Sequence, residues 1–234
     1  MDTLFSGVSE GYRVERKYFL SQSAALALRS RLDPVMHRDP HSDARRHYSI
    51  ASVYLDDRDD HALLSSLLGL QRRKKYRVRA YNGSDDFLSV ECKRKEGSLS
   101  WKTSFRISRT EYDALLSGDP APLLSHDCDL ARELYCDMRV SGYRFRSIVA
   151  YDREVYVHPI ERVRITFDTN LRGAVGRCDL FSPGHLFPIL APDVILLEVK
   201  YRHFLPDFIA DLLPRDAMPA TANCKYARAR AIDY

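Results

Sequence analysis

The chain has 234 residues and a mass of 27.0 kDa, which is enough for a substantial hydrophobic core. Hydrophobic residues at 45% and charged residues at 29% exclude a wholly disordered chain, and 10 Gly with 11 Pro exclude a fibrous one. The net charge is only +4, so any strong attraction for anions must come from how the cations are arranged.

No targeting segment or metal-binding cysteine pattern is evident. The first twenty residues contain Arg13, Arg16 and Lys17 and no apolar run, and the apolar run Val194–Leu197 is interrupted by Glu198. Five cysteines are scattered without a C-x-x-C pair, which indicates neither a disulfide framework nor a zinc site. We therefore expect a reduced, cytoplasmic protein with no membrane span in this chain.

Eight segments are predicted to be β-strands, because they are rich in Val, Ile, Tyr and Phe and alternate with a period of two. In chain order they are Tyr12–Leu20, His47–Leu55, Lys75–Tyr81, Phe87–Lys95, Ser98–Ile107, Arg146–Val157, Arg162–Asp168 and Val194–Tyr201. Asn82-Gly83 and Glu96-Gly97 lie between neighbouring strands and are typical of hairpin turns.

Six segments are predicted to be helices. They are Ser23–Arg31, Asp57–Leu68, Ser108–Leu116, Asp129–Met138, Pro206–Leu213 and Ala222–Ile232. Ser108 and Glu111 form the capping-box pattern at the start of the third helix. Because no linker or repeat divides the chain, we expect one domain over residues 1–234. Hairpin-joined strands with helices outside predict an antiparallel α+β fold, with a closed barrel as one option.

Charged side chains recur on one face of strand after strand. Residues i and i+2 of a strand share a face, so Arg77 and Arg79 lie opposite the apolar Val78. The same separation is predicted for further charged groups, namely Glu15/Lys17, Glu91/Lys93, Lys102/Arg106, Arg162/Arg164/Asp168 and Glu198/Lys200. For any single strand, a solvated face is the simpler interpretation.

Taken together, these faces could instead line the inside of a barrel. Such a cavity would hold many cations, whose mutual repulsion and desolvation are costly unless an anion fills it. Arginine forks and lysine ammonium groups suit phosphate oxygens. The carboxylates among them would repel phosphate unless a hard divalent cation such as Mg²⁺ or Mn²⁺ bridges the two.

These residues resemble a known family. The matching motifs, in family order, are Arg13-Val14-Glu15-Arg16-Lys17-Tyr18, Ser52-Val53-Tyr54-Leu55-Asp56, Tyr76-Arg77-Val78-Arg79-Ala80-Tyr81, Glu91-Cys92-Lys93, Tyr151-Asp152-Arg153, Arg162-Val163-Arg164-Ile165-Thr166-Phe167-Asp168, Leu197-Glu198-Val199-Lys200-Tyr201 and Cys224-Lys225-Tyr226. They resemble the polyphosphate-polymerase (VTC) domain of the vacuolar transporter chaperone family, a member of the triphosphate tunnel metalloenzymes or CYTH superfamily. The resemblance covers nearly the whole chain.

The resemblance implies an eight-stranded antiparallel β-barrel that forms a tunnel, with helices packed outside. It also implies transfer of the ATP γ-phosphate onto a growing polyphosphate chain with Mn²⁺ or Mg²⁺. The implied catalytic and phosphate-binding cations are Lys17, Arg77, Arg79, Lys93, Arg153, Arg164, Lys200 and Lys225, with Lys102 and Arg162 as weaker substrate-binding candidates. The implied metal ligands are Glu198, as the main one, with Glu15 and Glu91. Structural pairing of Lys17 and Lys200 with nearby glutamates is an alternative.

Some positions depart from the family pattern. Arg13 stands where tunnel hydrolases have the first Glu of E-x-E-x-K, which favours a polymerase over a triphosphatase. Cys224 stands where the family usually has Ser, and the lysine that follows in the family motif is retained as Lys225. The sensor domain and membrane helices of eukaryotic members are absent from this sequence, as in a stand-alone bacterial-type member.

Two other functions stay open. One is a tripolyphosphatase or nucleoside triphosphatase of the same fold, and the other is a non-catalytic module that binds polyphosphate or nucleic acid. Few aromatic residues lie on the charged strand faces, which counts against nucleic acid. We expect ATP and inorganic polyphosphate as partners and no nucleic acid, and a membrane partner is left open.

Overall fold

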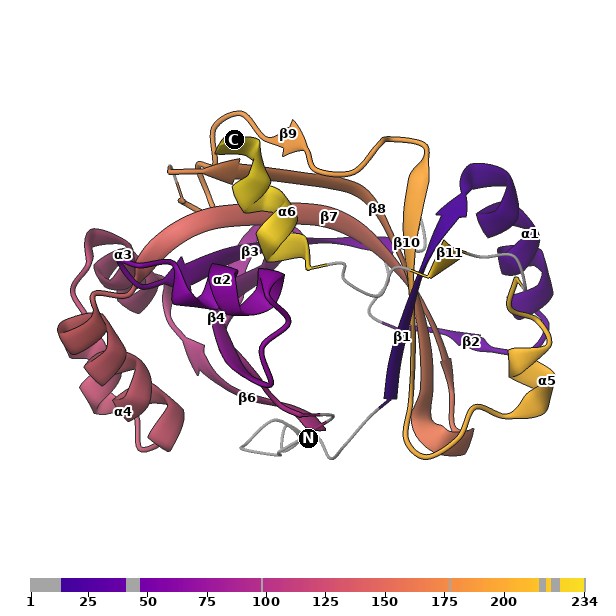
Figure 1. Ribbon diagram of the computed structural model, residues 1–234, viewed down its shortest axis with the longest axis horizontal. Helices are drawn as coiled ribbons and strands as arrows, with labels where there is room; N and C mark the ends of the chain where they lie inside the picture. Colours follow the sequence, from indigo (N-terminus) through magenta and orange to yellow (C-terminus); the bar gives the residue numbers. More distant parts are fainter. Residues whose placement is uncertain are drawn as a thin grey trace.

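Eight long antiparallel strands form one strongly curved sheet (Figure 1). The computed structural model describes residues 14–40, 47–97, 99–176, 178–214, 218–219 and 224–233. The long strands are β1 (Val14–Ser21), β3 (His47–Asp56), β4 (Arg72–Tyr81), β5 (Ser84–Glu96), β6 (Leu99–Ile107), β7 (Arg144–His158), β8 (Val163–Val175) and β10 (Val194–Tyr201). Their order across the sheet is β1-β10-β8-β7-β3-β4-β5-β6.

Three two-residue strands extend this sheet. Strand β2 (His37–Arg38) pairs with β7, β9 (Phe187–Pro188) pairs with β8, and β11 (Met218–Pro219) pairs with β1. None of the three was predicted, because two residues carry too little alternation to be recognised.

Each of the eight predicted strands becomes one of the long strands, and the predicted α+β antiparallel class is confirmed. Asn82 and Gly83 have φ angles of 53° and 69°, the left-handed region that a tight two-residue hairpin turn needs. The predicted start of one strand at Arg162 is wrong by one residue, because Arg162 ends a short 3₁₀ turn (η3, Ile160–Arg162) with φ 47°. Tyr12, Arg13 and Ser98 lie outside the described residues.

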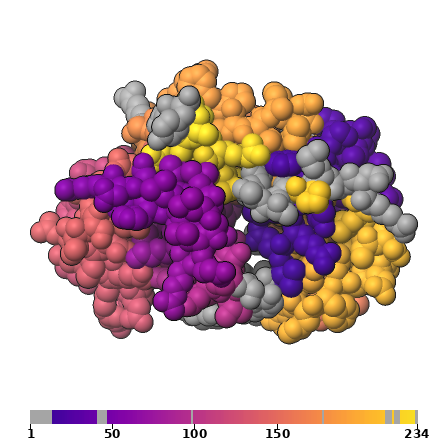
Figure 2. All heavy atoms as spheres, viewed as in Figure 1, coloured from indigo at the N-terminus to yellow at the C-terminus, as the bar shows by residue number. Residues whose placement is uncertain are grey.

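The sheet curls toward a barrel but leaves a seam between its first and last long strands. Within the described ranges, no backbone ladder joins β6 to β1. An ion pair spans the seam instead, between Lys93 Nζ of β5 and Glu15 Oε2 of β1 at 2.9 Å. Figure 2 shows the surface hollowed between the segment containing α2 (purple) and β1 (indigo).

Four helices cover the convex outer face of the sheet (Figure 1). Helices α1 (Gln22–Leu32) and α5 (Asp207–Ala210) pack on the outer residues of β1, β8 and β10. Helices α3 (Arg109–Ser117) and α4 (Asp129–Cys136) cover β3, β4 and β5. The predicted capping box is present, since both the Ser108 side chain and the Glu111 side chain accept their backbone N–H bonds.

Helix α6 (Lys225–Arg230) differs, because it packs against the concave inner face. A Cβ on Gly173 of β8 would lie 2.9 Å from Ala229 Cβ and 3.0 Å from the Ile148 carbonyl oxygen, so glycine permits this close packing. Lys225, at the start of the helix, points to Asp168 and Glu198 on the concave face. The predicted start of this helix at Ala222 lies outside the described residues.

Helix α2 (His61–Leu67) lies beside α6 and is held to it by polar contacts. The buried Asp56 carboxylate accepts the backbone N–H groups of Ala62 and Leu63 and also the Tyr226 hydroxyl at 2.6 Å. Because Asp56 binds the first-turn N–H groups, the helix begins at His61 rather than at the predicted Asp57. The two helices form one unit on the inner face.

Candidate active site

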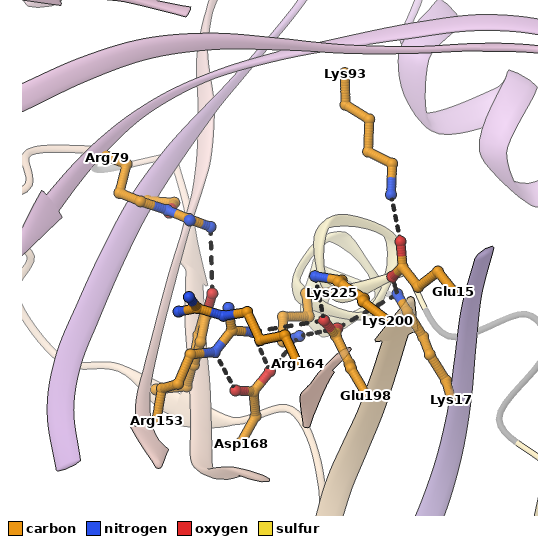
Figure 3. Close-up of polar contacts among 12 residues, drawn as sticks. Glu15, Lys17, Arg79, Lys93, Arg153, Arg164, Asp168, Glu198, Lys200 and Lys225 are labelled. Atoms are coloured by element: carbon orange, nitrogen blue, oxygen red, sulfur yellow. Dashed lines mark hydrogen bonds and ion pairs between the residues drawn. The ribbon is translucent and has the colours of Figure 1, made fainter. Parts of the chain in front are cut away.

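The charged faces predicted from strand alternation, apart from Arg162, point into the concave side of the sheet. Outward residues of the same strands form two apolar clusters under the outer helices, which fixes the opposite residues as inward. Seven strands and α6 supply the predicted cations that point inward, which are Lys17, Arg77, Arg79, Lys93, Lys102, Arg153, Arg164, Lys200 and Lys225, and Lys75 of β4 shares their face. Figure 3 shows most of them directed toward one another.

Glu198 of β10 is the centre of the main ion-pair group (Figure 3). Its carboxylate lies 2.9 Å from Lys225 Nζ, 3.1 Å from Lys200 Nζ and 3.5 Å from Lys17 Nζ. Arg153 Nη2 lies 3.6 Å away. The side chain of Glu198 is only 5% exposed, so four cations from four elements meet at one buried carboxylate.

Asp168 of β8 is a second buried acid in this group, and sequence analysis did not select it as a site residue. Arg153 donates two hydrogen bonds to it, at 2.6 and 2.7 Å, in a bidentate arrangement. Lys225 Nζ lies 2.7 Å from the same carboxylate, which is fully buried. Its position on the charged face of the Arg162–Asp168 segment is the sequence feature that could have identified it as a site residue.

Glu91 of β5 organises a separate group on the opposite wall. Arg77 contacts it at 2.5 and 2.7 Å, Lys102 at 3.4 Å and Arg79 at 4.0 Å. Among the residues that the structure describes, these three cations pair with Glu91 and not with Asp168 or Glu198 beside Lys225. The structure therefore does not bring Glu91 together with the other two predicted metal ligands.

Glu15 of β1 links the two walls. It contacts Lys17 at 3.0 Å on its own strand and Lys93 at 2.9 Å across the seam. Lys17 thus pairs with both Glu15 and Glu198. The structural pairing of Lys17 and Lys200 that the sequence left open is present.

Tyr151 of β7 connects cations that do not pair with one another. Its hydroxyl accepts a hydrogen bond from Arg79 Nη2 at 3.2 Å. Lys225 Nζ and the guanidinium of Arg153 lie 4.9 and 5.1 Å from the centre of its ring. Sequence analysis included Tyr151 in a family motif but gave it no role.

Two predicted arginines lie at the edge of the group. Arg164 donates to the Tyr48 hydroxyl at 3.0 Å and pairs with Asp39 at 3.1 Å, and its side chain is 33% exposed. Arg162 is exposed in η3, and the structure does not bring it to the other cations. Arg13, which replaces a family glutamate, lies outside the described residues.

The ion pairs keep both kinds of charge ionised in the interior. Burial alone would raise the pKa of Glu198, but Lys200, Lys225 and Lys17 hold it well below its usual value. Burial would likewise lower the pKa of Lys225, but Asp168 and Glu198 raise it. The pKa of Asp168 is also lowered, because Arg153 and Lys225 outweigh its burial.

The acids fit a divalent ion only if phosphate oxygens complete its shell. Within the described part of the chain, no group of three or more His, Cys, Asp or Glu side chains could hold a metal by itself. Mg²⁺ is commonly held by one or two carboxylates together with substrate phosphates. Glu198 and Glu15, which share Lys17, suit such a site, and Glu91 does not share it.

A cavity of about 490 Å³ lies elsewhere, between α1 and the outer face of β7. Its arginines, Arg29 and Arg38, are already paired with Glu154. Because these arginines are already neutralised, the cavity is less suited to binding an anion than the inner face of the sheet.

The curved antiparallel sheet with its outer helices is a fold that other solved structures share. A structure of a proposed adenylyl cyclase from Hippeastrum, whose description reports a dominant triphosphatase activity, shares 12% identity and covers 94% of this chain and 95% of its own, with a TM-score of 0.55. A proposed adenylate cyclase from Bacillus halodurans shares 13% identity over 86% of each chain, with a TM-score of 0.51.

The family model of the VTC domain matches residues 12–234, so the chain belongs to the VTC domain family. Among curated proteins, none matches the sequence. Within the residues that the structure describes, no helix has the length and apolar character needed to cross a bilayer.

Proposed function

We propose that this protein is a polyphosphate polymerase that transfers the γ-phosphate of ATP onto a growing inorganic polyphosphate chain. Membership of the VTC domain family supports this function. The observation that carries it is the meeting of Lys17, Lys200, Lys225 and Arg153 at one buried carboxylate, Glu198. Cations on the inner face outnumber the carboxylates that pair with them, and a polyanion is the ligand that offsets the remaining positive charge.

In the proposed step, the bond between the γ-phosphorus and the β–γ bridging oxygen breaks. A terminal oxygen of the acceptor chain forms the new bond to that phosphorus, and ADP leaves with the bridging oxygen. The acceptor oxygen is already ionised, so no general base is required. The protein's task is to hold the reacting phosphates in line and to neutralise their charge.

The inward cations divide this task between two walls. Arg77, Arg79 and Lys102 lie on the wall of β4 to β6, and Arg153, Lys200 and Lys225 lie on the other wall and α6. A bound Mn²⁺ or Mg²⁺, held by Glu198 and Glu15 with phosphate oxygens, would supply further neutralisation of phosphate charge. Because ATP is the proposed substrate, we place the reaction in the cytoplasm.

The state of the tunnel acids favours transfer over hydrolysis. Activating a water needs a base whose pKa is near the working pH. Burial is outweighed by neighbouring cations for Glu198, Asp168 and Glu15, so the pKa of each carboxyl is lowered. Such weak bases suit an acceptor that needs no deprotonation.

The test is a product assay with purified protein, ATP and Mn²⁺, resolved on a gel. Long polyphosphate supports the polymerase, release of free phosphate alone supports a hydrolase, and no turnover with retained polyphosphate binding supports a binding module. The informative variant is Glu198→Gln, which we expect to lose turnover while still binding polyphosphate. Glu133→Gln is the matched control, because Glu133 is also ion-paired, to Arg94 and Lys74, but on the outer face.

Loss of one tunnel cation should reduce the rate without abolishing the fold. We expect Arg77→Met to lower kcat by about 10²–10³-fold, the usual effect of removing one preorganised donor. Its partner Glu91 keeps Lys102 and Arg79 nearby, so the carboxylate is not left without a cation.

A further inference from the structure

We propose that two aromatic side chains at one end of the tunnel, Tyr81 and Phe87, with the buried Tyr48 packed behind them, bind the nucleobase of a nucleoside triphosphate. The inference rests on the proposed function, because it assumes that the triphosphate lies among the tunnel cations. It adds a recognition site for a part of the substrate that carries no phosphate.

The three rings form a continuous set on the inner face. The centroids of Tyr48 and Tyr81 are 5.9 Å apart, and those of Tyr81 and Phe87 are 5.8 Å apart. Tyr81 is the next inward residue of β4 after Arg77 and Arg79, and Phe87 follows the Asn82-Gly83 turn on β5. The set therefore lies at the hairpin end of the two strands that carry the Glu91 group.

The rings begin where the line of cations ends. Two residues along a strand advance about 7 Å, so Tyr81 lies one inward step beyond Arg79. The Arg79 guanidinium is 5.9 Å from the centre of the Tyr81 ring, and the same side chain donates to Tyr151 within the main site. On the other wall, Arg164 donates to the Tyr48 hydroxyl. A nucleotide held by these arginines would have its base directed at the rings.

The exposure of Tyr81 and Phe87 separates them from core aromatics, whereas Tyr48 is itself buried and supports the Tyr81 ring from the core side. Tyr81 and Phe87 are both half-buried, so each keeps ring surface that a ligand could cover. At the other end of β3, Tyr54 and Tyr226 also stack, at 5.1 Å, but both are buried and the Tyr226 hydroxyl is bonded to Asp56. That second pair is part of the α2–α6 contact and has no surface to offer.

The chemistry predicts stacking with little discrimination between bases. Every nucleobase has a π face, and stacking on an aromatic side chain contributes without reading the hydrogen-bonding edge. Arg106 already lies over the Phe87 ring at 4.3 Å, so a base on Phe87 would stack on ring surface that Arg106 does not cover. The ligand class is therefore a nucleoside triphosphate in general, with ATP and GTP bound alike.

The experiment compares ATP, GTP and inorganic triphosphate by calorimetry at one fixed Mn²⁺ concentration. We expect Tyr81→Leu and Phe87→Leu each to weaken ATP and GTP binding by about 5- to 150-fold, and to change triphosphate binding less than twofold. Tyr81→Phe should keep wild-type affinity for all three. Trp101→Leu, on the outward face of β6, is the control and should alter none of them.

The outcomes distinguish the two proposals. If the wild type binds both ligands but the Leu variants weaken ATP and triphosphate by the same factor, or weaken neither, the nucleobase site is wrong and the proposed function is unaffected. If the wild type binds neither ligand and forms no product from ATP, the proposed function itself fails. Thermal unfolding of each variant confirms that it is folded before affinities are compared.

Discussion

The sharpest test of the site's construction is the substitution Asp168→Asn. Asp168 is fully buried, accepts two hydrogen bonds from Arg153 and lies 2.7 Å from Lys225. The substitution keeps the side chain's shape but removes its charge, so both cations must then rely on Glu198. Glu198 already lies within 4 Å of two other lysines.

The expected cost follows from this geometry. Removing one partner of a buried ion pair destabilises a protein by about 3–5 kcal/mol, because the other charge stays buried without compensation. For a chain of this size, each kcal/mol lowers the melting temperature by about 2–4 °C, so we expect a decrease of about 6–20 °C. Inorganic triphosphate should restore more stability to Asp168→Asn than to the wild type, because it supplies the missing negative charge.

The assay is urea and thermal unfolding, each with and without triphosphate. Asp129→Asn is the matched control, because the Asp129 side chain is fully exposed, and we expect it to change stability by less than about 0.5 kcal/mol. If Asp168→Asn is as stable as this control without ligand, then the Arg153–Asp168–Lys225 group does not hold the inner face together as described.

Three further outcomes are expected. Gly173→Ala should lower the free energy of unfolding by about 1–3 kcal/mol, because the added methyl group overpacks against Ala229, and adding Ala229→Gly should recover part of this loss. Urea unfolding of the single and double variants measures both effects, and an unchanged stability of Gly173→Ala would contradict the packing of α6. Burial would raise the pKa of Glu91, but Arg77 outweighs it, so this pKa is lowered in the folded state. The ionised carboxylate therefore contributes stability above about pH 4.5, and this contribution is lost as the pH falls below that value. Acid unfolding of Glu91→Gln should accordingly show a smaller pH dependence of stability than that of the wild type. Triphosphate should slow alkylation of Cys224, measured by peptide mass spectrometry, because this thiol lies beside the tunnel cations; unchanged labelling would place the anion elsewhere.

The alternation of charged and apolar residues was enough to predict the long strands and the face that each presents. Arg77 and Arg79, for example, point inward because Tyr76 and Val78 are required in the outer core. Alternation is a local property, and it therefore could not show that β6 and β1 lack a ladder in the described residues.

Contacts between distant residues account for what the sequence did not show. Asp168 and Asp56 are aspartates of ordinary local context, and only the packing of α6 brings Lys225 and Tyr226 to them. The inward position of α6 depends on Gly173, some fifty residues earlier, whose missing side chain has no local signature. The aromatic set was missed for the same reason, since Tyr48 meets Tyr81 only through strand pairing.

The paired state of the inner face has a consequence for how salt should affect ligand binding. Lysines and arginines on the inner face, Lys75 and Arg106 included, outnumber the carboxylates they face, which are those of Glu15, Asp39, Glu91, Asp168 and Glu198. These carboxylates act as counter-ions that are covalently attached and cannot diffuse away. The inner face thus carries fixed charges of both signs, and the slope of affinity against ionic strength should follow the surplus of positive charge rather than the full number of lysines and arginines.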